Sequence, residues 1–167
     1  MLDCWMAFDV EYTVRLAEVL RPYCLKWMEE CLVPDDLDGH IALRQRLPWQ
    51  TLATGEHWYG TPPFQWAIRH QVVDILQPDI AWCGGMTTVT HIAAAAEAAG
   101  VNVILHGGAV TPYGQHFTFA NPSSPWGEYF VASPPGVPLE EASRVPGQAV
   151  AKDGYLVPND APGFGLE

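Results

Sequence analysis

Short apolar runs alternate along the chain with segments whose apolar residues recur at helical spacing. The short runs predict buried parallel strands at residues 2–5, 24–28, 51–54, 73–76, 102–105 and 129–130. The longer segments predict helices at residues 10–20, 36–47, 63–71, 88–99 and 112–120. Asp9 is placed to cap the first helix, and Thr87 or Thr88 to cap the fourth. Strands that alternate with helices pair in parallel, so the pattern predicts an α/β fold of consecutive β/α units.

A carboxylate or a histidine follows each apolar run, at nearly even intervals. The six residues are Asp3, Glu29, Glu56, Asp79, His106 and Glu128, and the intervals are 26, 27, 23, 27 and 22 residues. One strand, one helix and two loops occupy an interval of this size. The carboxyl ends of parallel strands open on one side, where β/α barrels carry their chemistry. We therefore expect the six polar groups to converge on one mouth.

The length limits how much of such a fold the chain can hold. A complete eight-unit barrel takes about 250 residues, whereas this chain has 167. We expect a partial (β/α) TIM-type barrel of about six units in residues 1–133, incomplete at its N-terminus. Residues 134–167 are rich in proline and glycine, and predict a loop-rich tail of the same domain with a hairpin turning at Asp153-Gly154.

Composition narrows the class of protein. A hydrophobic content of 49% with 16% charged residues is typical of a folded globular chain. The net charge of −11 disfavours nucleic acid and anionic membranes as partners. The sequence contains no run of about 18 apolar residues and no cationic N-terminal region, so we expect a cytoplasmic protein. Four widely spaced cysteines predict buried thiols in a reducing compartment.

Three of the predicted strand ends carry acids that suit a metal ion. Asp3, Glu29 and Glu56 follow successive strands, and three ionised carboxylates at one mouth would repel each other without a cation. Their hard oxygen ligands favour Mg²⁺. Any one of these acids alone is more often a helix cap or a solvated loop residue. Three in register favour the metal site.

The next two strand ends predict a general base. Asp79 and His106 follow adjacent strands, whose ends lie about 5 Å apart, so the carboxylate can orient the imidazole and raise its proton affinity. A lone histidine beside glycines is more often a satisfied loop residue, but the aspartate one unit earlier favours the dyad. A metal facing this base indicates abstraction of a proton α to a carboxylate. Glu128 could donate a hydrogen bond to the substrate if protonated.

Six motifs carry a resemblance to a known family. They are LDCW at 2–5, KWMEECL at 26–32, TGEH at 54–57, QPDIAWCGGMTT at 77–88, HGG at 106–108 and PGFG at 162–165. In this combination the chain resembles the enolase superfamily, and within it the mandelate racemase-like acid sugar dehydratases. The resemblance runs over nearly the whole chain.

The resemblance implies a role for each polar group. Asp3, Glu29 and Glu56 match the family's Mg²⁺ ligands, with Glu29 rather than Glu30 as the second ligand. His106 and Asp79 match the base dyad, Glu128 matches the acid that assists at the substrate carboxylate, and His57 matches a residue that contacts substrate. The implied reaction is loss of water from a 6-deoxy aldonate, a small sugar acid. Full-length relatives are commonly homo-oligomers.

The resemblance also implies that family elements are absent from this sequence. Family members have a capping domain and the first barrel strands ahead of the LDCW strand, so we expect the 167-residue chain alone to have little or no dehydratase activity. Two alternatives remain open: a racemase or epimerase of the same superfamily, and a non-catalytic fragment or pseudoenzyme. A metal-dependent hydrolase barrel is disfavoured, because none of the six histidines forms the expected HxH pair.

Overall fold

Five strands form one parallel sheet in the order β1-β2-β3-β4-β5. The structure, a computed structural model, describes residues 1–131, 133–138, 141 and 145–166. The strands are β1 (Leu2–Asp3), β2 (Met28–Glu29), β3 (Leu52–Thr54), β4 (Ile75–Leu76) and β5 (Asn102–Val103). The order of strands along the sheet is therefore the order along the chain, as consecutive β/α units require.

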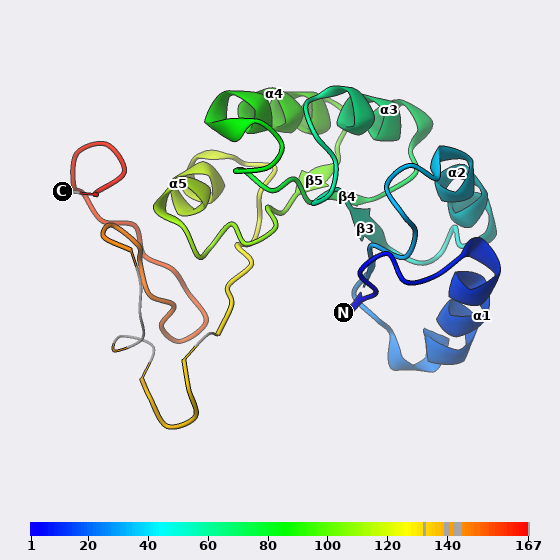
Figure 1. The fold of residues 1–167 in the computed structure, drawn as a ribbon, viewed down its shortest axis with the longest axis horizontal. Helices are drawn as coiled ribbons and strands as arrows, with labels where there is room; N and C mark the ends of the chain where they lie inside the picture. The colour runs from blue at the N-terminus through cyan, green and yellow to red at the C-terminus, as the bar shows by residue number, and fades with distance from the viewer. Residues whose placement is uncertain (132, 139–140, 142–144, 167) are drawn as a thin grey trace.

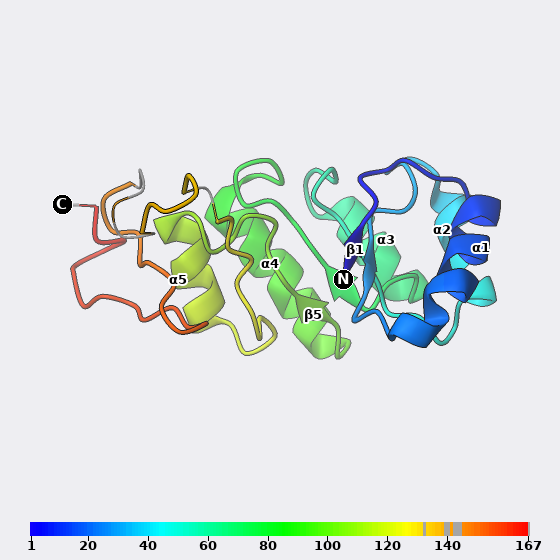
Figure 2. The ribbon, with the colours of Figure 1, turned by 90° about the horizontal axis from the view of Figure 1, so that it is seen from below.

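Helices connect the strands and lie on one side of the sheet. They are α1 (Val10–Leu20), the 3₁₀ helix η1 (Arg21–Tyr23), α2 (Leu37–Arg46), α3 (Pro62–His70), α4 (Gly85–Ala98) and α5 (Pro112–Ala120). In Figure 1 the helices form the outer side of an arc and the strands its inner side. Figure 2 shows the same succession along the long axis, with the C-terminal tail beyond α5. The predicted α/β fold, as part of a β/α barrel, is confirmed.

The main core lies between the sheet and the helices. Alternate strand residues face it, namely Met28, Leu52, Leu76 and Val103, and all are nearly inaccessible to solvent. Ala17 of α1, Leu43 of α2, Phe64 of α3 and Ala93 of α4 supply the helix side. The apolar positions that predicted the helices are therefore the positions that cover the sheet.

Side-chain caps explain where several helices begin. The Asp9 carboxylate accepts from the backbone N–H of Tyr12 at 2.7 Å, and the Asp36 carboxylate accepts from that of Gly39 at 2.9 Å. The expected threonine cap of α4 is wrong. This helix begins earlier, at Gly85 after Gly84, because both glycines adopt positive φ angles that let the chain turn into the helix sooner.

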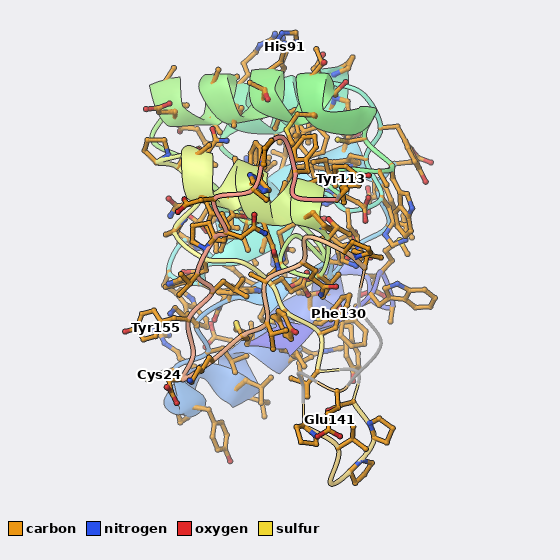
Figure 3. All side chains as sticks on the ribbon, turned by 90° about the vertical axis from the view of Figure 1, so that its left-hand side faces the viewer. Cys24, His91, Tyr113, Phe130, Glu141 and Tyr155 are labelled. Carbon is orange, nitrogen blue, oxygen red and sulfur yellow. The ribbon has the colours of Figure 1, made fainter. Side chains whose placement is uncertain are left out.

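The second predicted strand begins later than expected. Pro22 does not end the helical path but lies within η1, and Cys24 closes η1 in a left-handed conformation, with φ of 49°. The backbone therefore becomes extended only near Met28. Cys24 is also exposed at the surface, as Figure 3 shows, which corrects the expectation of four buried cysteines. The other three cysteines are buried, and all four are free.

The structure assigns no strand to residues 129–130, where the sequence predicted a sixth. The segment after α5 contacts β5 and the loop that follows β5 through single hydrogen bonds: Val103 N–H donates to Ser123 O, and Ala109 N–H to Glu128 O. Pro122 and Pro125 lack the N–H that a ladder needs, so regular pairing is interrupted there. The described residues therefore hold five strands instead of six.

The turn at Asp153-Gly154 is present in the tail. Both residues have positive φ, and Lys152 and Tyr155 exchange two backbone hydrogen bonds as a single antiparallel bridge. Residues 132, 139–140, 142–144 and 167 lie outside the described part of the chain, and the division at residue 133 stays a prediction. No helix in the described ranges has both the length and the apolar character needed to cross a bilayer.

Candidate active site

On the inner face of the sheet, apolar residues are followed by polar residues toward the carboxyl ends of the strands. A small buried cluster within or directly beside the strands consists of Trp27, Ala53, Ile75 and Ile104. Side chains alternate between faces along a strand, so residues two positions further on face the same side. These residues are Glu29, Gly55, Gln77 and His106. Alternation along the strands therefore places the polar residues Glu29, Gln77 and His106 on one face at the carboxyl end of the sheet.

Asp79 and His106 form the predicted contact. They pair as an isolated parallel bridge beyond β4 and β5, and His106 Nδ1 lies 2.9 Å from Asp79 Oδ2. The other carboxylate oxygen accepts the backbone N–H groups of Ala81 and Trp82, at 2.7 and 2.9 Å. The carboxylate is thus fixed from both sides, and it holds the imidazole with Nε2 on the side away from Asp79.

Charges around this pair shift both pKa values. The hydrogen bond to Asp79 outweighs burial and raises the pKa of His106 to about 9, with the carboxylates of Glu56 and Glu128 adding to the effect. Burial disfavours the charged form of Asp79, yet the His106 contact and two backbone hydrogen bonds together hold its pKa below the ordinary value. The pair therefore favours an imidazolium beside a carboxylate at neutral pH.

Glu56 lies between two imidazoles. Its Oε2 is 3.7 Å from His106 Nε2, and its Oε1 is 3.5 Å from His57 Nδ1. Burial, followed by the negative charge of Glu30, raises the pKa of Glu56 to about 7, although both histidines oppose this shift. A pKa this high means that the positive charge near the buried Glu56 carboxylate does not fully compensate its ionised form. A bound cation would supply the missing positive charge.

Gly55 allows β3 to deliver Glu56 to this position. Its φ is +135°, and a Cβ there would lie 2.9 Å from Phe64 Cε1 and 3.2 Å from the Gln77 backbone nitrogen. We expect Gly55→Ala to lower the free energy of unfolding by about 3 kcal/mol, because strain and a clash combine. Urea denaturation measures this loss.

Gly100→Ala is the matched control for Gly55→Ala. Gly100 also has a positive φ, of +70°, but a Cβ there meets nothing within 4 Å. We expect a loss of about 1 kcal/mol from the left-handed backbone alone. Equal losses in the two variants would contradict the close packing of β3 against Gln77 and Phe64.

Asp3, Glu29 and Glu128 lie around a cavity of about 550 Å³ that Gln77 also lines. Glu29 is buried and accepts the indole N–H of Trp27 at 2.8 Å, whereas Asp3 is exposed and accepts the backbone N–H of Trp5. Glu128 accepts the backbone N–H of Gly107 at 2.6 Å. Burial raises the pKa of Glu128, and the charges of Glu29 and Asp3 raise it further. The hydrogen bond from Gly107 and the charge of His106 act in the opposite direction.

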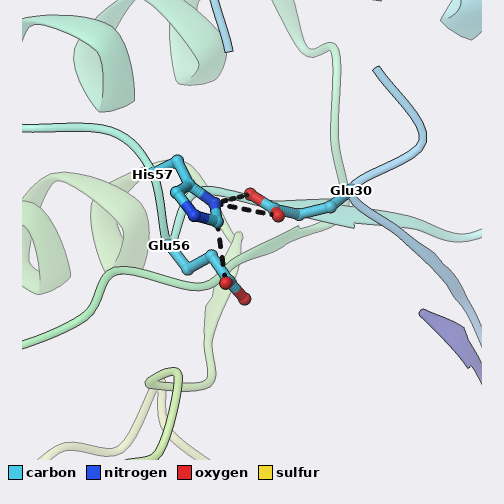
Figure 4. Close-up of side chains that lie close together, drawn as sticks. All are labelled: Glu30, Glu56 and His57. Carbon is cyan, nitrogen blue, oxygen red and sulfur yellow. Dashed lines mark hydrogen bonds and ion pairs between the residues drawn. The ribbon is translucent and has the colours of Figure 1, made fainter. Parts of the chain in front are cut away.

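Glu30, which the sequence analysis set aside in favour of Glu29 as a metal ligand, also lies near the mouth. Figure 4 shows its carboxylate against the His57 ring, with Nδ1 3.0 and 3.1 Å from the two oxygens. One ligand atom from each of Glu30, Glu56 and His57 falls within 4.8 Å of the others. Among the described residues no comparable group includes Asp3 and Glu29, so the predicted set Asp3, Glu29 and Glu56 stays a prediction.

The donor set nevertheless fits a divalent cation. Buried or partly buried carboxylates gather at one end of the sheet, where burial and then the neighbouring negative charges raise the pKa values of Glu56 and Glu128. Carboxylate oxygens are the ligands that Mg²⁺ prefers. A cation among them would offset the negative charge.

Parallel β/α units with acids and a carboxylate-held histidine at the strand ends are typical of a barrel enzyme that removes protons beside a carboxylate. A family profile described as "Enolase C-terminal domain-like" matches residues 1–167. The chain belongs to this family, and the resemblance drawn from the motifs is confirmed.

The most similar proteins include sugar-acid dehydratases. The L-rhamnonate dehydratase of Saccharopolyspora erythraea is 41% identical over 170 residues, which cover 99% of this chain and 43% of the relative. The crystal structure of L-rhamnonate dehydratase from Gibberella zeae matches with a TM-score of 0.85 and 35% identity, over 99% of this chain and 43% of that one. L-Talarate dehydratase from Polaromonas sp. JS666, complexed with Mg and L-glucarate, matches with a TM-score of 0.68 and 33% identity, over 77% of this chain and 35% of that one. This chain thus spans less than half the length of each of these proteins.

Proposed function

We propose that this chain carries the base and the metal ligands of a Mg²⁺-dependent sugar-acid dehydratase, with L-rhamnonate as the substrate. The Asp79–His106 pair supports the proposal most directly, because it places an oriented imidazole 3.7 Å from Glu56. The similarity to L-rhamnonate dehydratases supports the choice of substrate. A homo-oligomeric protein in the cytoplasm remains part of the proposal.

Asp3, Glu29 and Glu56 are the proposed Mg²⁺ ligands. When bound, Mg²⁺ supplies Lewis-acid polarisation of the substrate carboxylate, which makes the adjacent C2 proton more acidic. Burial of Glu29 and Glu56 against the sheet restricts their carboxylates, so these two ligands are partly oriented before the ion arrives.

His106 carries the proton through both halves of the reaction. The neutral fraction of His106 acts as the base: its Nε2 accepts the C2 proton, and the imidazolium so formed then donates that proton to the C3 hydroxyl, which leaves as water. The resulting enol loses the proton of its C2 hydroxyl and takes a proton at C3, which gives a 2-keto-3-deoxy acid. Glu128, whose pKa burial raises, is proposed to donate a hydrogen bond to the substrate carboxylate, and His57 to contact a substrate hydroxyl.

Magnesium is expected to stabilise the chain through the proposed ligands. Mg²⁺ should raise the thermal unfolding midpoint, because a ligand that binds only the folded state stabilises it. Glu29→Gln should abolish the shift, whereas Glu97→Gln, an exposed change on α4, should preserve it. Differential scanning fluorimetry with and without EDTA measures both.

One further variant separates the two possible ligand groups. His57→Asn should preserve the magnesium shift if Asp3, Glu29 and Glu56 hold the ion. Loss of the shift in His57→Asn but not in Glu29→Gln would instead assign the ion to Glu30, Glu56 and His57, and would contradict the proposed set.

The reaction itself is best tested in a completed protein. We define this as residues 1–167 joined behind the segment of the Saccharopolyspora erythraea relative that precedes its matching region, since the chain covers 43% of that relative. We expect low activity from the 167-residue chain alone, because β1 and β5 leave the sheet open at both edges. The completed protein should form a 2-keto acid from L-rhamnonate, and epimerisation at C2 without loss of water would favour a racemase or epimerase instead.

A further inference from the structure

Glu30 and His57 form a second carboxylate–imidazole pair beside the first. The Glu30 side chain is only 2% exposed, and both of its oxygens lie near the same His57 nitrogen, Nδ1, at 3.0 and 3.1 Å. Among the described residues, His57 is the only hydrogen-bond partner of this buried carboxylate, so their contact offsets part of the cost of burying it.

The two pairs flank Glu56. Figure 4 shows His57 between Glu30 and Glu56, and His106 Nε2 approaches the other oxygen of Glu56. The Trp82 ring lies beside both imidazoles, with centroid separations of 5.6 Å to each. His57 and His106 therefore border one common space, each with its Nδ1 against a carboxylate.

The backbone at Glu30 is held in a conformation that turns its side chain out of the strand pattern. Its φ is +45°, a left-handed value that non-glycine residues rarely adopt. Hydrogen bonds on both sides fix it there: Glu30 N–H donates to Ala53 O of β3, and Glu30 O accepts from Met6 N–H in the loop after β1. Regular alternation would instead have directed Glu30 toward the helices, away from Glu29. Strain maintained in this way is often found where a side chain must be aimed at a functional site.

We propose that Glu30 is a positioning residue for His57. It accepts the Nδ1–H of the neutral ring, so Nε2 stays unprotonated and can accept a hydrogen bond from a hydroxyl of the sugar acid. No described residue provides a hydrogen-bond partner for His57 Nε2, which leaves this atom available. The identity of the ligand rests on the proposed function, whereas the ring tautomer can be measured without any ligand, and Glu30 lies closer to Nδ1 than Glu56 does.

The tautomer of His57 tests the proposal directly. Long-range ¹H–¹⁵N NMR on the metal-free 167-residue chain, at a pH high enough for the ring to be neutral, distinguishes Nδ1–H from Nε2–H. We expect Nδ1–H in the unchanged chain. In Glu30→Gln we expect a mixture with Nε2–H, because the amide can donate to Nδ1 as well as accept from it. Glu97→Gln should leave the spectrum unchanged.

Glu30→Asp keeps the proposal testable if Glu30→Gln does not fold. It preserves the charge but shortens the side chain, so the Nδ1–H preference should weaken without vanishing. An Nε2–H ring in the unchanged chain, or the same tautomer in every folded variant, would overturn the proposal. In the completed protein, Glu30→Gln should lower kcat more than it raises KM. If Glu30→Gln shifts the tautomer as expected but the completed protein shows no dehydratase activity, the positioning role of Glu30 stands and the proposed function is contradicted.

Discussion

Replacing His106 with asparagine is expected to reduce 2-keto acid formation by the completed protein by about 10³-fold or more. Asparagine retains a polar atom near the position of Nδ1, so the contact with Asp79 can survive while proton transfer at Nε2 is lost. The substrate affinity should change little, because the variant removes the proton carrier and not the metal ligands. A coupled assay of 2-keto acid formation measures the loss.

The control for this variant is His91→Asn, an exposed change on α4 that faces away from the site. It should retain full activity. If His106→Asn kept more than about one tenth of the unchanged rate, proton transfer would have to occur elsewhere, since general base catalysis typically contributes at least about 10²-fold.

Replacing Asp79 with asparagine is expected to lower the pKa of His106 from about 9 toward its ordinary value of 6.5. The Asp79 carboxylate is the largest cause of the raised pKa, and the neutral amide removes its charge while keeping its shape. NMR titration of the metal-free chain follows the ring directly. A His106 pKa that stays near 9 in Asp79→Asn would show that Glu56 and Glu128 are sufficient to cause the shift.

The same variant has a predictable effect on stability. A histidine whose folded pKa is raised contributes stability that is fully present below about pH 6.5 and is lost as the pH rises through about 9. The unchanged chain should therefore lose this contribution across that interval, while Asp79→Asn should lose little there. Urea denaturation at pH 6 and pH 9.5 compares the two, and equal pH dependence in both chains would contradict the assignment.

The base dyad could be predicted from the sequence because it depends only on topology. Asp79 and His106 each follow an apolar run, and successive parallel strands bring such positions together whatever the helices between them contain. The strand order pairs the two backbone positions, and the side chains then meet at 2.9 Å. The α/β class and the first helix, α1 after its cap Asp9, could be predicted because the spacing of their apolar residues is clear.

The contact between Glu30 and His57 could not be predicted in this way. It depends on a left-handed backbone at Glu30, and nothing about a glutamate indicates positive φ. Likewise, the late start of β2 follows from the left-handed turn at Cys24, and the early start of α4 from two glycines in unusual conformations. Periodicity locates extended and helical segments, whereas single-residue turns between them depend on tertiary contacts.

The direct test of the whole account is product formation by the completed protein with L-rhamnonate, measured with Mg²⁺ and again after EDTA. We expect a 2-keto-3-deoxy acid to form with Mg²⁺, to be lost with EDTA, and to be lost equally in His106→Asn. The Saccharopolyspora erythraea relative, assayed in parallel, is the positive control. If it is active and the completed protein folds and binds Mg²⁺ but forms no 2-keto acid, the assignment of residues 1–167 as a functional dehydratase segment is contradicted.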